Sequence, residues 1–277
     1  MKRKTKSNIL RVISLTFLIL ILVLTYLPIL VIALTSFSTD KFGVAMPGFT
    51  FMWYEKMWQS RSLVNAIMYT LQISVISTAI SIVFGTLSAI GIHSLSKKSR
   101  KLFIMLNNVP ILNADIVTAA FLLIVFQLVG LILGRTVLGT TTTLIAHVLF
   151  STPYVILSVL PKLSELNDSL FDASLDLGCS PLKALRKTIL PNIKTGIVTG
   201  GLLAFTMSID DFIITYFVTG KRQNFSTWLY GSLKTLRNGL WNQACAYNTL
   251  LLVITFVVVF GYQFIQIKRK GKKAWEN

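Results

Sequence analysis

Long uninterrupted runs of apolar residues constrain this chain of 277 residues more than any other feature. A helix needs about 20 consecutive apolar residues to cross the hydrocarbon core of a bilayer. Inside a bilayer the backbone has no water to bond, so such runs must fold as helices. The sequence therefore predicts an all-α, polytopic membrane protein, one transmembrane domain over residues 1–277. Six runs qualify, at about residues 10–34, 64–93, 102–133, 140–160, 189–209 and 244–267.

The composition agrees with a membrane location, because 53% of the residues are hydrophobic and only 13% are charged. The net charge of +17 could suggest a nucleic-acid partner, but the positions of the charges argue against one. With a cytoplasmic N-terminus, 19 of the 27 Lys and Arg residues fall in segments on the inner side. This asymmetry is the positive-inside rule. It predicts a multi-pass protein of a bacterial inner membrane with both termini cytoplasmic, bound to lipid and not to nucleic acid.

The third apolar run is too long for one straight span. Its 32 residues would reach about 48 Å at about 1.5 Å per residue, and the hydrocarbon core is about 30 Å thick. Polar residues and Pro110 interrupt it between Asn107 and Asp115. A break in the helix is expected there, with an apolar helix resuming at Ile116. In the fifth run, Gly196 and Gly200 have the spacing that lets two membrane helices approach closely.

Three aspartates lie in or beside the apolar runs: Asp115, Asp210 and Asp211. A carboxylate at the bilayer centre costs about 2.5–3.5 kcal/mol on insertion scales, so such acids usually face a bundle interior or a solute path. Adjacent carboxylates repel each other unless a cation lies between them, which favours an amine as the solute. Two simpler alternatives remain. Asp115 could cap the resuming helix, and the Asp210–Asp211 pair could end the fifth helix at the wet interface.

No catalytic or metal-binding pattern stands out in the sequence. His93 and His147 lie in different apolar runs without Cys or carboxylate spacing around them, so they are interpreted as packing or interface histidines. The chain has no Gly-x-x-x-x-Gly-Lys-Ser/Thr loop and no supported nucleophile–His–acid arrangement. We therefore expect a non-catalytic chain without a cofactor of its own.

Residues 161–188 form a long connection on the predicted cytoplasmic side. The stretch Asp172–Leu177 is expected to form a short amphipathic helix that Gly178 ends. Ser180 is expected to cap a second helix with Pro181 at its first position. This basic second helix runs into Leu190-Pro191, where the fifth apolar run begins. A helix–Gly–helix elbow joined to a spanning helix suits a segment that passes on the motion of a docked partner.

This elbow resembles the Glu-Ala-Ala loop of permease subunits in binding-protein-dependent ABC importers. The family pattern is Glu-Ala-Ala, three residues, Gly, nine residues, Ile, one residue, Leu-Pro. The chain departs from it at Ser174, in place of the second Ala, and at Thr188, in place of the Ile. The resemblance implies that the elbow is a coupling helix seated on a cytoplasmic ATPase, which binds ATP and Mg²⁺. The matching positions are Asp172, Ala173, Gly178, Leu190 and Pro191.

Further stretches are similar to spermidine/putrescine permease subunits. They are Ser208-Ile-Asp-Asp211 with Phe217-Val-Thr-Gly220, Gly48-Phe-Thr with Trp53-Tyr54, and Asp115-Ile-Val. The resemblance implies a polyamine importer with a second permease subunit, two ATPase copies and an external polyamine-binding protein. It also implies a solute path lined by Trp53, Asp115, Ser208, Asp210 and Asp211.

Three alternatives stay open on the sequence alone. The aromatic residues of the external loops could form an interfacial belt instead of lining a path. The solute could be another small molecule, since a fold does not choose its cargo. The chain could also be a proton-coupled carrier that uses Asp210 and Asp211 as a relay.

Overall fold

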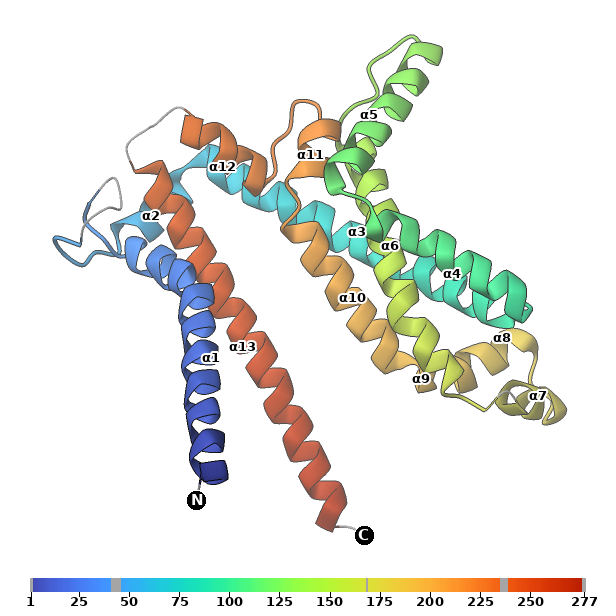
Figure 1. Cartoon of the computed structure of the whole chain (residues 1–277). Helices are drawn as coiled ribbons and strands as arrows, with labels where there is room; N and C mark the ends of the chain where they lie inside the picture. The colour runs from blue at the N-terminus through green and yellow to red at the C-terminus, as the bar shows by residue number, and fades with distance from the viewer. Residues whose placement is uncertain (1, 41–45, 168, 235–238, 276–277) are drawn as a thin grey trace. The chain divides into compact units, whose positions relative to one another are not determined.

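The computed structural model describes residues 2–40, 46–167, 169–234 and 239–275, which fold as helices joined by turns (Figure 1). This architecture confirms the all-α prediction. The contacts divide the chain into two compact units, Met1–Val64 with Leu229–Asn277, and Asn65–Trp228. That both units act as one membrane domain stays a prediction.

The first unit contains α1 (Lys2–Thr35), α2 (Met52–Gln59) and α13 (Leu240–Trp275). Asn242 of α13 is fully buried, and its side-chain amide donates to the carbonyl oxygens of Thr35 (3.2 Å) and Asp40 (2.9 Å). The amide therefore satisfies backbone carbonyls at the end of α1, where the helix provides no partner. The apolar side chains along α1 are largely exposed, as suits a helix that meets lipid.

The second unit holds most of α3 (Arg61–Ser94) and the following helices up to the start of α12 (Phe225–Lys234). The longer ones are α4 (Lys97–Leu112), α5 (Asp115–Ile132), α6 (Thr140–Ser164) and α10 (Lys194–Ile209). The shorter ones are α7 (Ser169–Asp176), α8 (Pro181–Ala184), the π-helix η1 (Leu185–Ile189), α9 (Leu190–Asn192) and α11 (Ile213–Val218).

The third predicted span is two helices, α4 and α5, separated at Asn113 and Ala114. Both residues adopt extended backbone angles, with ψ of 146° and 135°, so the predicted break is confirmed. The part long and apolar enough to cross a membrane is α5. The alternative in which Asp115 caps α5 is wrong by one residue. Ala114 is the capping residue, and Asp115 lies in the first turn, where its charge complements the helix dipole.

Five helices of the described chain are long and apolar enough to cross a membrane, those containing residues 14–35, 61–94, 115–132, 140–164 and 240–257. The predicted fifth span is the shorter α10, with 16 residues. At about 1.5 Å per residue α10 rises about 24 Å, less than the hydrocarbon thickness of about 30 Å. Its start is set back because Ile193 leaves helical geometry between α9 and α10. The count of six spans depends on α10 and stays a prediction.

Glycines set the packing of the second unit, where α10 lies against α6 (Figure 1). A β-carbon on Gly196 would lie 2.8 Å from the carbonyl oxygen of Ser158, and one on Gly200 would lie 2.9 Å from Cα of Val155. One on Gly85 of α3 would lie 2.6 Å from Cβ of the fully buried Val155. Helices α3 and α10 therefore approach α6 at Val155 and Ser158 more closely than any larger residue allows, which confirms the predicted close contact at Gly196 and Gly200.

We predict that Gly200→Ala destabilises the protein, whereas Gly91→Ala does not. A β-carbon at Gly91 meets nothing within 4 Å, so this exposed position in α3 is a matched control. Both changes gain about 0.5–1 kcal/mol of helix propensity, but crowding at position 200 costs about 1–3 kcal/mol. Thermal unfolding of the purified variants measures the difference. Equal melting temperatures would contradict the close contact.

Candidate functional site

The elbow of residues 161–188 contains a helix stop at Gly178. The amide of Gly178 donates to the carbonyl of Leu175 (2.8 Å), and the amide of Cys179 donates to that of Ser174 (3.1 Å). These two bonds form a Schellman motif, which requires a left-handed residue. Gly178 supplies it with φ of +82°. The predicted stop is thus confirmed, and α7 begins at Ser169, before the expected Asp172.

The second limb of the elbow differs from the predicted regular helix. Ser180 occupies the capping position before Pro181, but its side chain makes no capping hydrogen bond, so that part of the prediction is wrong. The helix then widens into η1, and the amide of Leu190 bonds to the carbonyl of Leu185, five residues back. Pro191 has no N–H to continue the ordinary ladder, which accounts for the wider turn at this point.

The elbow presents apolar and basic side chains to its surroundings. Leu177 is 86% exposed and Leu182 is 79% exposed, one on each side of Gly178. Lys183, Arg186 and Lys187 are exposed on the second limb. An apolar pair exposed on a charged, water-facing segment is typical of a protein contact surface. The sequence motif did not single out either leucine, although both flank its glycine.

The residues that match the Glu-Ala-Ala pattern fall into two groups. Asp172, Ala173 and Gly178 are exposed on the first limb, whereas Leu190 is half-buried and Pro191 is exposed at the start of the next helix. The matching residues therefore lie in α7 and at its glycine stop, and again in α9.

The two departures from the family pattern contact each other. The hydroxyl oxygens of Ser174 and Thr188 are 2.9 Å apart, and Ser174 is 8% exposed. The Ser174 hydroxyl donates to the carbonyl of Leu170 (2.8 Å), so the Thr188 hydroxyl donates to Ser174. A hydrogen bond joins the two limbs here, where the family pattern has an alanine and an isoleucine.

The Asp210–Asp211 pair occupies the turn between α10 and α11, and its two members have different surroundings. Asp210 ends α10 and is exposed, and no partner binds its carboxylate among the described residues. The Asp211 side chain is 8% exposed. Its Oδ1 accepts from the amide of Ile214 (3.2 Å), and its Oδ2 accepts from the amide (2.7 Å) and hydroxyl (2.7 Å) of Thr215. Asp211 lies one residue before the N-cap Phe212, and its carboxylate caps α11 by accepting from two amides of the first turn.

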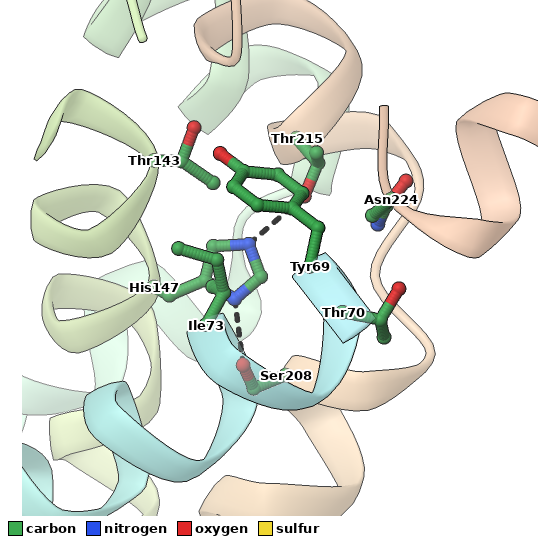
Figure 2. A pocket seen from close by; sticks show the side chains of 8 residues that line it. All are labelled: Tyr69, Thr70, Ile73, Thr143, His147, Ser208, Thr215 and Asn224. Atoms are coloured by element: carbon green, nitrogen blue, oxygen red, sulfur yellow. Dashed lines mark hydrogen bonds between the residues drawn. The ribbon is translucent and has the colours of Figure 1, made fainter. Parts of the chain in front are cut away.

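A buried hydrogen-bond chain connects Asp211 to α6, α10 and α3, and Figure 2 shows its middle part, the contacts of His147 with Thr215 and Ser208. His147 of α6 is 1% exposed, and its Nε2 lies 2.9 Å from the Thr215 hydroxyl and 3.5 Å from Asp211 Oδ2. Its Nδ1 lies 2.7 Å from the hydroxyl of Ser208 on α10, which lies 3.1 Å from that of Ser77 on α3. The sequence interpretation of His147 as a packing residue missed this chain, because its partners are far away in sequence.

The side chains around His147 are closely packed (Figure 2). Tyr69, Thr70, Ile73, Thr143 and Asn224 complete the lining, and the space among them does not admit a water-sized molecule. In this conformation Ser208 and His147 hold the bundle together and leave no room for a solute.

The other two predicted path residues do not join this chain of hydrogen bonds in the described residues. Asp115 is exposed at the start of α5. Trp53 belongs to the first unit, where it is 2% exposed and its indole N–H donates to the carbonyl of Ser38 (2.6 Å). The ammonium of Lys56 lies 5.0 Å from the Trp53 ring centre, a cation–π contact.

Metal-binding groups of three or more His, Cys, Asp or Glu side chains are absent from the described residues. The arrangement offers a capped helix end with one exposed carboxylate, and an elbow with an exposed apolar tip.

Comparison with known proteins points to one family. Residues 81–270 match the model for "Binding-protein-dependent transport system inner membrane component". The chain is 29% identical to the spermidine/putrescine transport system permease protein PotC of Haemophilus influenzae, over 91% of this chain and 95% of that protein. It is 31% identical to PotC of Escherichia coli K12, over 89% and 91%.

Among solved structures, the fold is similar to a bacterial ABC transporter involved in the import of alginate. The TM-score is 0.72 with 16% identity, over 96% of this chain and 98% of that one. The bacterial alginate transporter was also solved in complex with an alginate-bound periplasmic protein, and that match has a TM-score of 0.69 with 16% identity, over 94% of each chain. At this identity the likeness shows the fold alone.

We predict that the Ser174–Thr188 hydrogen bond holds the two limbs of the elbow together. Ser174→Ala or Thr188→Ile alone should each weaken the contact by about 1 kcal/mol, the usual value of a net hydrogen bond. Trypsin cleavage at Lys183 and Arg186, which reports local opening, should then become about fivefold faster. The double variant restores the apolar pair of the family pattern and should return cleavage toward the wild-type rate. If the two single effects simply add, the contact does not stabilise the elbow.

Proposed function

Because this chain belongs to the family of binding-protein-dependent transport system inner membrane components, we propose that it is a permease subunit of an ATP-driven polyamine importer. Spermidine and putrescine are the proposed solutes. The observation that carries the proposal is the similarity, over about nine-tenths of both chains, to permeases named for these two polyamines.

The proposed energy source is a partner chain. The exposed leucines and basic residues of the elbow would dock on a cytoplasmic ATPase, which binds ATP and Mg²⁺, and this chain would catalyse no reaction. We propose two ATPase copies, a second permease subunit and an external polyamine-binding protein. Support for the external partner comes from the alginate transporter, which was solved with its periplasmic protein.

The proposed orientation in the bacterial inner membrane puts both termini and the elbow on the cytoplasmic side. The distribution of Lys and Arg supports it. ATP-driven movement of the elbow would then reach α10 directly, since η1 and α9 connect the two. Such a connection suits alternating access, in which helices rock between outward- and inward-facing arrangements.

Asp210 is the proposed contact for the polyamine ammonium group, because its carboxylate is exposed and unpartnered in the described chain. An ammonium–carboxylate hydrogen bond is charge-assisted and about twice as strong as a neutral one. Trp53, Asp115 and Ser208 remain proposed members of the path. The shielded Asp211 is proposed to shape it through its cap on α11.

We expect Asp210→Asn to lower ATP-dependent spermidine uptake about tenfold, by loss of the charge that attracts the amine. Uptake is measured in vesicles that contain the whole assembly. Glu165→Gln is the matched control, because Glu165 is an exposed acid paired with Lys162 (2.7 Å) at the cytoplasmic end of α6. Uptake that follows a proton gradient without ATP would indicate a secondary carrier. Uptake of another solute in place of polyamines would show that the proposed substrate is wrong.

We further expect Leu177→Ser with Leu182→Ser to weaken ATPase binding about tenfold. Removing two exposed leucines forfeits apolar area that only a docked partner buries. Co-purification of the ATPase with the permease measures the effect. The control is Leu131→Ser with Ile132→Ser, a pair that is 80% and 83% exposed at the end of α5. Unchanged ATPase recovery from the elbow variant would contradict the docking surface.

A further inference from the structure

We propose that His147 is a positioning residue for the solute site, an inference that rests on the proposed function. Through Thr215 it holds the Asp211 carboxylate on the first turn of α11, so that Asp210 alone faces the solute. The sequence pattern gives His147 no such role.

The direction of the hydrogen bonds fixes the tautomer of His147. The Thr215 hydroxyl donates its single hydrogen to Asp211 Oδ2 (2.7 Å), so it must accept from the ring. The hydrogen therefore lies on Nε2, which is 2.9 Å from that hydroxyl. In the neutral ring Nδ1 then accepts from Ser208 (2.7 Å). The chain runs in one direction, from Ser208 through His147 and Thr215 to the carboxylate.

This chain bridges the break between α10 and α11. Ser208 lies in the last turn of α10 and Thr215 in the first turns of α11, and the ring of His147 binds both from α6. The Asn224 side chain adds a second tie, since it donates to the backbone carbonyl of Asp211 (2.6 Å). The geometry of the turn is therefore set from outside the turn.

The same contacts give the two aspartates different roles. Both oxygens of Asp211 accept from donors of α11 and its side chain is only 8% exposed, so burial keeps this carboxylate from a solute. The next residue back, Asp210, is exposed. A ring that keeps Asp211 turned toward α11 keeps the backbone of the turn in place, and with it the exposed Asp210.

A histidine that served packing alone would behave differently. It would leave a ring nitrogen to solvent or to a single partner, and leucine would replace it at small cost. Here both nitrogens are within hydrogen-bond distance of hydroxyls, and the ring is 1% exposed. Leucine would leave Thr215 and Ser208 without their buried partner, which is costly in a dry interior.

Three substitutions of His147 distinguish the hydrogen bond at Nε2 from the hydrogen bond at Nδ1. Glutamine can place an amide N–H near the Nε2 position and keep the bond to Thr215. Asparagine reaches only the Nδ1 position and keeps the bond to Ser208, and leucine keeps neither. In the complete assembly we expect His147→Gln to stay within about threefold of the wild-type half-saturating spermidine concentration. His147→Asn should raise it about tenfold, as expected for losing the hydrogen bond toward the charged Asp211, and His147→Leu, which loses both hydrogen bonds, should raise it at least as much.

A second measurement does not depend on the solute. Hydrogen exchange at the amides of Ile214 and Thr215 reports the cap by Asp211. It should be about tenfold faster in His147→Asn and His147→Leu than in His147→Gln, with His93→Gln, a change to the half-buried histidine in the last turn of α3, as a control. If the wild-type assembly takes up no polyamine but the exchange rates differ in this way, the proposed polyamine substrate is wrong and the positioning role of His147 stands.

The role would be overturned if His147→Leu matched the wild type in both measurements, or if His147→Gln were as impaired as His147→Leu. If the leucine variant does not assemble, the glutamine and asparagine variants still decide, because both are polar and differ only in which side of the ring they replace. Equal half-saturating concentrations and equal exchange rates for His147→Gln and His147→Asn would also overturn the role, because the hydrogen bond to Thr215 would then make no difference.

Discussion

The capping of α11 by the Asp211 carboxylate is the contact on which the end of the predicted solute path depends. A helix that breaks at membrane depth exposes backbone N–H groups, and in lipid no water satisfies them. Asp211 accepts two of these groups and a hydroxyl, His147 of α6 lies beside the carboxylate, and Asn224 of the loop before α12 donates to the backbone carbonyl of Asp211. The break can therefore exist without an unsatisfied backbone, and the exposed Asp210 is a consequence of that arrangement.

Glycine and hydroxyl side chains together permit the bundle that surrounds this break. Gly85, Gly196 and Gly200 bring three backbones close at Val155 and Ser158 of α6. Close approach places the hydroxyls of Ser77 and Ser208 within reach of each other and of His147. Apolar packing between membrane helices has no solvent to drive it, so van der Waals contact and buried hydrogen bonds carry the association.

The shape of the elbow follows from local contacts. Gly178 supplies the left-handed turn, and the hydroxyls of Ser174 and Thr188 join the two limbs. The π-helix before Pro191 then carries the chain into α9 and α10. The exposed leucines at 177 and 182 are therefore connected to α10 through short helical segments.

The sequence by itself determined the helical class, the break before Asp115, the glycine stop of the elbow and the close approach at Gly200. Each of these follows from local composition, such as an apolar run, an interrupting polar stretch or a glycine spacing. The tertiary structure alone decided that the adjacent Asp210 and Asp211 differ, that His147 links Asp211 to Ser77 of α3, and that Ser174 meets Thr188. The two serines at 77 and 208 are 131 residues apart, and no periodicity in one segment specifies a partner in another. The short α10 was also not predicted, because the polar residues around Ile193 did not by themselves show that the helix is interrupted there, between α9 and α10.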